Sequence, residues 1–229
     1  MGFSKSNLSD GRPTTAEWPV RIWEESEFPV FAQEPVHRWM EHGFECYDFV
    51  FCPQRRTAAH SFSYVFGYGD DRIFYLREDE TPLFLERKQI QKITTSRVLL
   101  EAKIIIFFKT GEPLELSYVP STYYLYDPFL NWLLGLPKDF EPLVAEQQNP
   151  RPEKLFRESL PMFNYSLAAY RLGCGFQDYK YNSLKHRHKI FPWKVNLEEW
   201  LEVSMEQGTF QLHSIDYLTE CTYIVTGAG

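Results

Sequence analysis

Residues 60–77 read HSFSYVFGYGDDRIFYLR and residues 102–119 read AKIIIFFKTGEPLELSYV, and these two stretches decide the expected fold. Each contains two runs of β-branched and aromatic residues separated by a short turn sequence, Gly-Asp-Asp in the first and Thr-Gly-Glu in the second. Glycine supplies the positive φ that a tight hairpin turn needs. Both stretches are therefore predicted to form β-hairpins.

Runs of this kind follow one another along the middle of the chain. Their boundaries are 44–52, 60–68, 72–77, 82–86, 89–98, 102–109 and 113–119. Short strands at nearly regular spacing, with turn residues between them, are typical of an antiparallel sandwich or barrel. In the second run Phe62, Tyr64, Phe66 and Tyr68 share one face, so this strand has an apolar side that needs a cover.

The expected cover is the segment 127–135, which reads DPFLNWLLG. Asp127 suits the N-cap of a helix, Pro128 suits its first position, and Gly135 suits the left-handed residue just past its end. Asn131 is the only polar residue between them. The segment is therefore predicted to be a short helix that is buried nearly all round.

The order of these elements resembles a bacterial pleckstrin-homology-like (PH/GRAM-like) domain. The resemblance rests on a tyrosine-rich strand followed by DDRIFYL, PLFLERKQIQKI, AKIIIFFKTGEPLELSYV and the apolar helix. It implies an α+β fold, with a seven-stranded bent antiparallel barrel closed by a C-terminal helix and a smaller α/β segment appended. It implies a binding scaffold and brings no catalytic signature with it.

The sequence outside this stretch suggests four regions. We expect an N-terminal arm with a short helix at 33–42 in residues 1–43, the barrel at 44–137, a proline-rich linker at 138–152, and a C-terminal α+β region at 153–229. Pro161 is expected to break the helical segment 153–172. Residues 197–213 fit either a helix or a hairpin, and we favour a three-stranded meander completed by residues 221–225.

Composition limits the function classes. The formal net charge is −7, which argues against a general nucleic-acid binder. The four cysteines form no C-x-x-C pair and are expected to be reduced thiols. No run of residues is apolar enough to cross a bilayer and the first thirty residues lack a signal-peptide layout, so a cytoplasmic location is predicted.

Two basic clusters are candidate binding sites. Arg55 and Arg56 follow the first predicted strand, where lipid-binding members of the resembled family carry basic residues for inositol phosphates; the family's continuing Lys/Arg series is absent here. Residues 179–194 interleave cations with aromatic rings, a mixture that suits phosphate or stacked bases. The candidates in this second cluster are Lys180, Lys185, Arg187, Lys189, Trp193 and Lys194. The alternative is that both clusters are ordinary polar surface, with the second meeting the acidic residues of 196–206.

Candidates for chemistry are few. His186, His188 and His213 are weak metal candidates, because Lys185, Arg187 and Lys189 would repel a divalent cation. Cys174 lies between two glycines, and pairing it with a histidine requires a proximity that spacing does not show. We therefore predict no metal and no cofactor.

The sequence leads to three functional hypotheses. The first is a non-enzymatic interaction module that binds a protein partner, with sheet-edge pairing or aromatic faces providing the contact. The alternatives are a metal- or thiol-dependent enzyme that uses the C-terminal Cys and His residues, and recruitment to anionic lipid or phosphate through the basic clusters. Nucleic-acid binding ranks below these, and the oligomeric state is not predicted.

Overall fold

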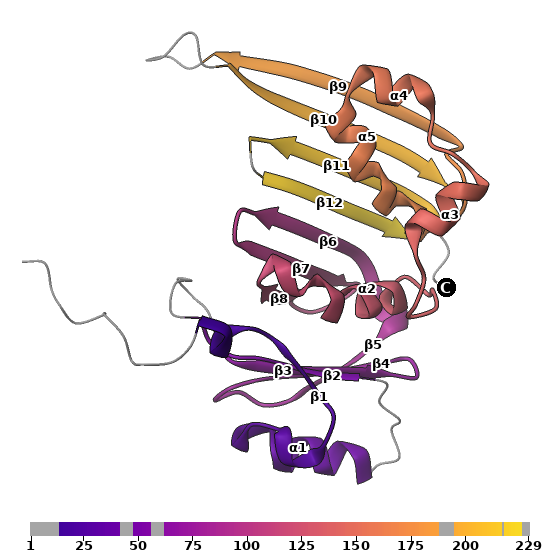
Figure 1. Cartoon of the computed structure of the whole chain (residues 1–229). Helices are drawn as coiled ribbons and strands as arrows, with labels where there is room; N and C mark the ends of the chain where they lie inside the picture. The colour runs from indigo at the N-terminus through magenta and orange to yellow at the C-terminus, as the bar shows by residue number, and fades with distance from the viewer. Residues whose placement is uncertain (1–13, 42–47, 56–61, 188–194, 217, 226–229) are drawn as a thin grey trace, which may run out of the picture. The chain divides into compact units, whose positions relative to one another are not determined.

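The computed structural model describes residues 14–41, 48–55, 62–187, 195–216 and 218–225. By its internal contacts the chain divides into two compact units, Met1–Leu85 and Glu86–Gly229. Each unit is built on its own antiparallel sheet, and Figure 1 labels the strands and helices. The chain is thus a mixed α+β protein with two sheets.

The first unit contains a five-stranded sheet in the order β1-β2-β3-β4-β5. Its strands are β1 (Val20–Ile22), β2 (Asp48–Cys52), β3 (Tyr64–Gly69), β4 (Arg72–Arg77) and β5 (Leu83–Glu86). Helix α1 (Val30–Glu41) packs on one face of this sheet, and short 3₁₀ helices η1 (Thr14–Glu17) and η2 (Glu25–Glu27) precede it.

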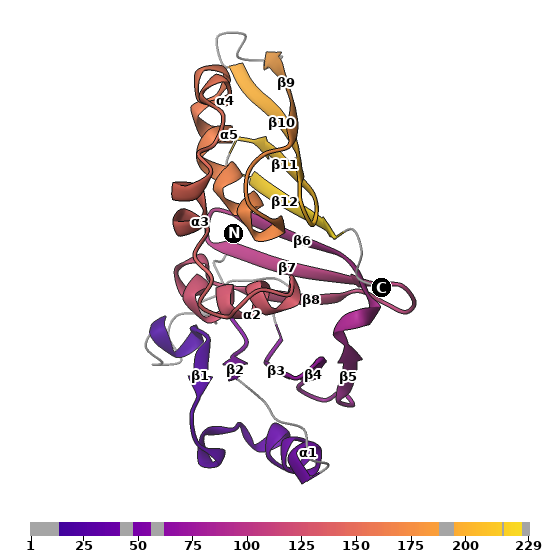
Figure 2. The same cartoon turned by 90° about the vertical axis from the view of Figure 1, so that its right-hand side faces the viewer.

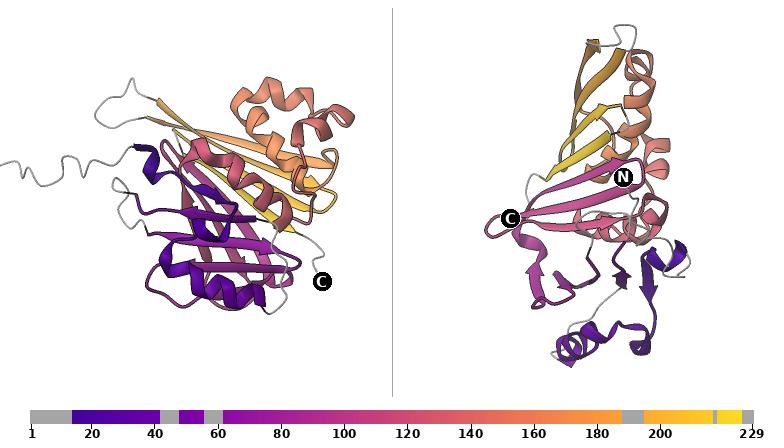
Figure 3. Two further views of the ribbon diagram at one scale, coloured as in Figure 1. Left: turned by 60° about the horizontal axis from the view of Figure 1, so that its bottom comes forward. Right: turned by 90° about the vertical axis from the view of Figure 1, so that its left-hand side faces the viewer.

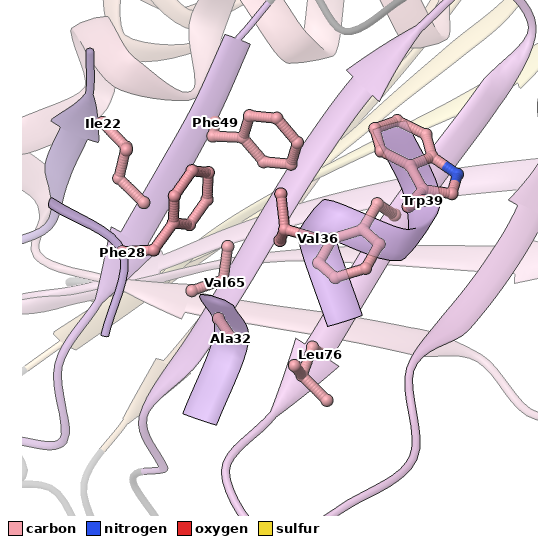
Figure 4. Packing of buried hydrophobic residues seen from close by; sticks show 9 residues of the cluster. Ile22, Phe28, Ala32, Val36, Trp39, Phe49, Val65 and Leu76 are labelled. Atoms are coloured by element: carbon pink, nitrogen blue, oxygen red, sulfur yellow. The ribbon is translucent and has the colours of Figure 1, made fainter. Parts of the chain in front are cut away.

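Aromatic rings fill the space between α1 and the sheet (Figure 4). The ring of Trp39 lies 5.8 Å from that of Phe49 and 5.5 Å from that of Phe74. The helix begins at Val30, three residues before the predicted start, and Pro35 lies inside it. Ala32 is fully buried and extends the apolar stripe of Val36 and Trp39 by one turn, a position that the sequence reading left outside the helix.

The second unit contains a seven-stranded sheet in the order β8-β7-β6-β12-β11-β10-β9. Its strands are β6 (Ile90–Val98), β7 (Glu101–Phe108), β8 (Leu114–Tyr118), β9 (Asp178–Arg187), β10 (Val195–Met205), β11 (Gly208–Ile215) and β12 (Leu218–Val225). The predicted meander is confirmed, because β10, β11 and β12 pair in sequence order.

The prediction of a seven-stranded barrel is wrong. The seven predicted runs do contain strands, but β2 to β5 belong to the first sheet and β6 to β8 to the second. On its other edge β6 pairs with β12, from Val98↔Leu218 to Lys92↔Ile224. A barrel needs that edge for closure, so both sheets remain open and the described residues form no closed barrel.

The helices of the second unit lie on one face of its sheet (Figure 2). They are α2 (Asp127–Leu133), α3 (Pro142–Gln148), α4 (Glu153–Glu158), α5 (Leu160–Tyr165) and the 3₁₀ helix η5 (Ser166–Leu172), with shorter 3₁₀ turns η3 (Arg87–Gln89) and η4 (Pro120–Leu125). The break at Pro161 is confirmed, because Ser159 separates α4 from α5 and its side chain caps α5. Within the predicted linker, residues 142–148 are helical and Ala145 is buried.

The short helix α2 is present and buried as predicted, but Asp127 is its first residue and Tyr126, not Asp127, is its N-cap. Trp132 is only 5% exposed, and Gly135 adopts a φ of +79°. The amide of Gly135 donates to the carbonyl of Trp132, and the amide of Leu136 donates to the carbonyl of Asn131. These two bonds form a Schellman motif, which requires the left-handed residue that glycine provides.

A buried polar network holds α2 against η5. Arg171 is 7% exposed; its Nε donates to Asn131 Oδ1 at 2.8 Å and its guanidinium lies 3.3 Å from the Asp127 carboxylate. The Asn131 amide donates to the carbonyls of Lys138 and Phe140. Both ends of the Asn131 amide group, its oxygen and its nitrogen, therefore have hydrogen-bond partners. Burial raises the pKa of Asp127, and the adjacent guanidinium partly offsets that rise.

Removing this guanidinium should lower stability strongly. We expect Arg171→Met to reduce the free energy of unfolding by about 3 kcal/mol, because it leaves the buried acceptor on Asn131 and the partly exposed carboxylate of Asp127 without their donor. Arg157→Met is the matched control, since that side chain is 73% exposed in an i,i+4 pair with Glu153 and should cost less than about 0.5 kcal/mol. Urea unfolding followed by circular dichroism measures both, and equal losses would contradict the assignment.

Candidate functional site

The two predicted basic clusters belong to different units of the chain. Arg55 is 7% exposed and belongs to the first unit, so its guanidinium is not part of an open surface. Arg56 lies outside the described residues, as do Lys189, Trp193 and Lys194. The remaining candidates, Lys180, Lys185 and Arg187, are exposed on β9 in the second unit.

Strand alternation divides these three cations between two faces. Lys180 lies opposite Glu202 and shares the face of Trp200, whereas Lys185 lies opposite Leu197 and Arg187 opposite Val195 on the face that carries the helices. We call the face without helices the polar face. The alternation therefore splits a cluster that is continuous in the sequence.

The polar face of β9 to β12 contains a hollow of about 530 Å³. All four strands contribute to its lining, which includes Lys180, Asn182, Trp200, Gln211, His213 and Glu220. Side chains at successive positions of a strand point to opposite faces. The residues that alternate with the lining ones are buried beneath the helices, and they include Leu201, Val203, Phe210 and Leu212. This alternation gives the hollow its composition. Sheet register and helix cover together determine which side chains are presented.

Trp200 occupies the middle of this surface. It lies opposite His213 on β11 and opposite Asn182 on β9. Its ring stacks on the imidazole of His213, with 5.4 Å between centroids and 9° between planes. The indole is thus held by a cross-strand contact, while its side chain remains only partly buried.

Glu198 joins two histidines from neighbouring strands. Its Oε2 lies 2.5 Å from Nε2 of His186, and its Oε1 lies 2.8 Å from Nε2 of His213. We call these three residues the His–Glu–His clamp. Hydrogen bonds from His213 and then His186 hold the pKa of Glu198 below its usual value. The clamp also fixes the ring on which Trp200 stacks.

A second carboxylate is fixed in the same way. Nζ of Lys180 donates to Oε1 of Glu202 at 2.9 Å, and Nε2 of Gln211 donates to its Oε2 at 3.1 Å. The hydrogen bond from Lys180 is the main reason that the pKa of Glu202 is lowered. Lys180 therefore meets the acidic strand that follows it in the sequence.

The histidines are arranged around a carboxylate. His186 and His213 both direct Nε2 at Glu198, and His188 lies outside the described residues. Within the described ranges no group of three or more His, Cys, Asp or Glu side chains is placed to hold a metal ion. The Nε2 atom of each of these two rings is engaged by the clamp.

Cys174 lies at the other end of the β9–β10 hairpin from His186. The segment around it is attached there by bonds from the Gln177 amide to the Ser204 carbonyl and from the Gln207 amide to the Leu172 carbonyl. His186 lies eight residues beyond Asp178, the first residue of β9. At the usual rise of a strand, eight residues separate the two positions by about 26 Å. The exposed thiol of Cys174 is therefore not adjacent to the imidazole of His186.

Comparisons with known proteins give no match. No family model fits the chain, and no curated protein and no solved structure is similar to it. Among the described residues, no helix has the length and apolarity needed to span a membrane.

Sequence reasoning missed the residues of β10 that line the hollow, Trp200 and Glu202, and the carboxylate at the centre of the clamp, Glu198. Trp200, Glu198 and Glu202 lie at alternate positions of β10, so a strand there places them on one face. That signal was present in the meander interpretation. The contributions of Gln211 and Glu220 depend on the register between strands, which the sequence does not show.

The clamp should make stability depend on acid pH. A carboxylate whose pKa is lower in the folded protein stabilises it above the unfolded pKa, and this contribution disappears as the pH falls through the folded value. We therefore expect the wild-type chain to lose its stability advantage over Glu198→Gln as the pH is lowered from about 6 to about 3. Denaturant unfolding across this range measures the difference.

Glu112→Gln is the control for this comparison, because it removes a charge from the exposed turn between β7 and β8. The free energy of unfolding of Glu112→Gln should differ less from that of the wild type than the free energy of Glu198→Gln does. This difference should also change less with pH across the same range. A Glu198→Gln profile parallel to the wild type would show that the clamp does not form.

Proposed function

We propose that this chain is a non-enzymatic interaction module that binds a protein partner on the polar face of β9 to β12. The observation that carries the proposal is Trp200, held in the middle of an open hollow by fixed polar neighbours. An aromatic anchor within a polar rim is the arrangement that contributes most energy at protein interfaces.

The state of the carboxylates favours recognition over catalysis. The pKa values of Glu198 and Glu202 are both lowered by hydrogen bonds from neighbouring side chains. A general acid at neutral pH needs a raised carboxyl pKa. These groups therefore stay ionised and act as fixed hydrogen-bond acceptors, which suits the binding of a surface.

The charge of the hollow favours a protein over a phosphate-bearing ligand. Lys180 is neutralised by Glu202, and Glu198 and Glu220 add further carboxylates on the same face. A phosphate would meet net negative charge there. A protein surface can instead supply donors to these acceptors and apolar area to Trp200.

We also propose a reducing compartment, the cytoplasm, for this interaction. Cys52, Cys174 and Cys221 are free thiols, and burial raises the pKa of Cys221 to about 12. Such a thiol stays protonated and inert at neutral pH.

The test is a quantitative comparison of partners recovered by the full chain and by Trp200→Ala. A partner captured from source cells and then purified should bind Trp200→Ala at least tenfold more weakly by calorimetry, since removing a central aromatic anchor costs about 2 kcal/mol or more.

Tyr165→Ala is the matched control, because this ring is 46% exposed on α5, on the opposite side of the sheet. It should bind the partner within about twofold of the wild type. Equal affinity of Trp200→Ala and the wild type would overturn the assignment of the surface.

A further inference from the structure

The outer edge of β9 is the long free edge of the seven-stranded sheet. β9 has 10 residues and is the terminal strand, so in the described sheet no strand pairs with its outward backbone groups. Its pairing with β10 is continuous from Asp178↔Ser204 to Arg187↔Val195, without a bulge, and the strand contains no proline. Side-chain oxygens of Asp178 and Asn182 accept hydrogen bonds from the backbone amides of Tyr179 and Ser183, so these contacts and the charged side chains protect the edge, without a bulge or a proline.

Two of those charges lack acidic partners. Lys180 is paired with Glu202 and His186 with Glu198 on the polar face. Lys185 and Arg187 are exposed on the other face, and among the described residues no carboxylate forms an ion pair with either. Lys185 and Arg187 therefore give one end of this edge a net positive charge.

Apolar side chains accompany these cations. Leu184, Val195 and Leu197 are each between 41% and 50% exposed around Lys185 and Arg187. The ends of β9 and β10 that carry them extend past α4 and α5 (Figure 3). An incoming strand here would meet both charge and apolar area.

We propose that β9 accepts an extended acidic segment of the partner as an additional strand of the sheet. This inference rests on the proposed function and defines the partner's chemistry. Side chains of an added strand alternate between the two faces. Acidic residues at every second position would face Lys185 and Arg187, and apolar residues between them would share the face of Leu184.

A second copy of this chain at the same edge would supply no acid to these cations. Residues directly opposite one another share a face of the sheet, so an antiparallel two-fold pairing near the middle of the strand is centred on Asn182 or on Ser183. It places Lys185 opposite Tyr179 or Tyr181, and Arg187 opposite Gln177 or Tyr179. Lipid headgroups and nucleic acids match the cations, but they cannot use the row of backbone donors and acceptors that the edge offers.

The test measures binding of a synthetic peptide to the full chain. The probe is a fluorescein-labelled eight-residue peptide that alternates Glu with Val and Thr, followed by fluorescence anisotropy at low salt. We expect saturable binding that weakens at 500 mM salt, and we expect no binding of the peptide with Lys in place of Glu. Methylating the amide nitrogens of its central residues should abolish binding, because this removes the strand's donors and keeps its charge.

Variants locate the site. Lys185→Glu with Arg187→Glu should weaken peptide binding at least tenfold. Lys88→Glu with Lys109→Glu makes the same change of charge at exposed positions beside β6 and β7 and should stay within twofold. Trp200→Ala should also stay within twofold, which separates this edge from the hollow. Unchanged circular dichroism confirms that each variant is folded.

Several results would overturn the proposal. They are absence of peptide binding, binding that survives amide methylation, and binding unaffected by the Lys185/Arg187 reversal. A concentration-dependent dimer abolished by that reversal would assign the edge to a second copy, and selective binding of phosphatidylserine vesicles or single-stranded DNA would assign the cations to phosphate. If the peptide fails while a Trp200-dependent partner is found, the strand addition is refuted and the proposed function is not.

Discussion

A buried guanidinium fixes the architecture of the second unit. Arg171 lies between η5, α2 and β12, where it contacts the side chains of Asn131 and Asp127, and its charge acts on Tyr223, whose pKa is raised by burial. An ion in such a place is costly unless its donors are satisfied, and the docked helices supply the acceptors that this guanidinium needs. The network thus specifies where the helix layer sits on the sheet.

The surface of the polar face follows from that docking. The helices cover Leu201, Val203, Phe210 and Leu212. The side chains at the alternating positions of the same strands must therefore point away from the helices. Trp200, Glu198 and Glu202 lie there because they are one residue out of phase with the core. Cross-strand pairs then fix their positions, with His213 under the indole and Lys180 against Glu202. The composition of the polar face is therefore a consequence of packing on the far side of the sheet.

Local structure could be predicted from the sequence, and global pairing could not. The hairpin turns, the cap at Gly135 and the break at Pro161 each depend on residues within one or two turns of chain, and they are found where predicted. In the first hairpin, however, Asp70 and not Gly69 has the positive φ. The choice of partner for β6 depends instead on β12, more than a hundred residues away, and alternation alone does not encode it. The barrel prediction failed at that strand, because an apolar alternating run fits a closed barrel and an open sheet equally well.

The candidate site shows the same division. The interpretation of 197–213 as strands was enough to place Trp200 and the carboxylates of β10 on one face. The candidate site predicted from the sequence was instead the run of cations on β9, treated as one continuous patch. Residue-by-residue alternation separates Lys180 from Lys185 and Arg187, and the register between strands brings His186 and His213 to one carboxylate. A linear cluster of charge is thus a poor guide to a surface when its residues lie on a strand.

The junction of β6 with β12 also bears on how the chain is made. Thr94 and Thr222, whose hydroxyl oxygens lie 3.4 Å apart, are separated by 128 positions. A ribosome releases these strands many seconds apart, and until the last of them emerges the edge of β6 has no neighbour. Completion of this sheet is consequently a late event in biosynthesis. A chain that lacks β12 would expose the unpaired edge of β6, which could then pair with strands of other proteins and aggregate.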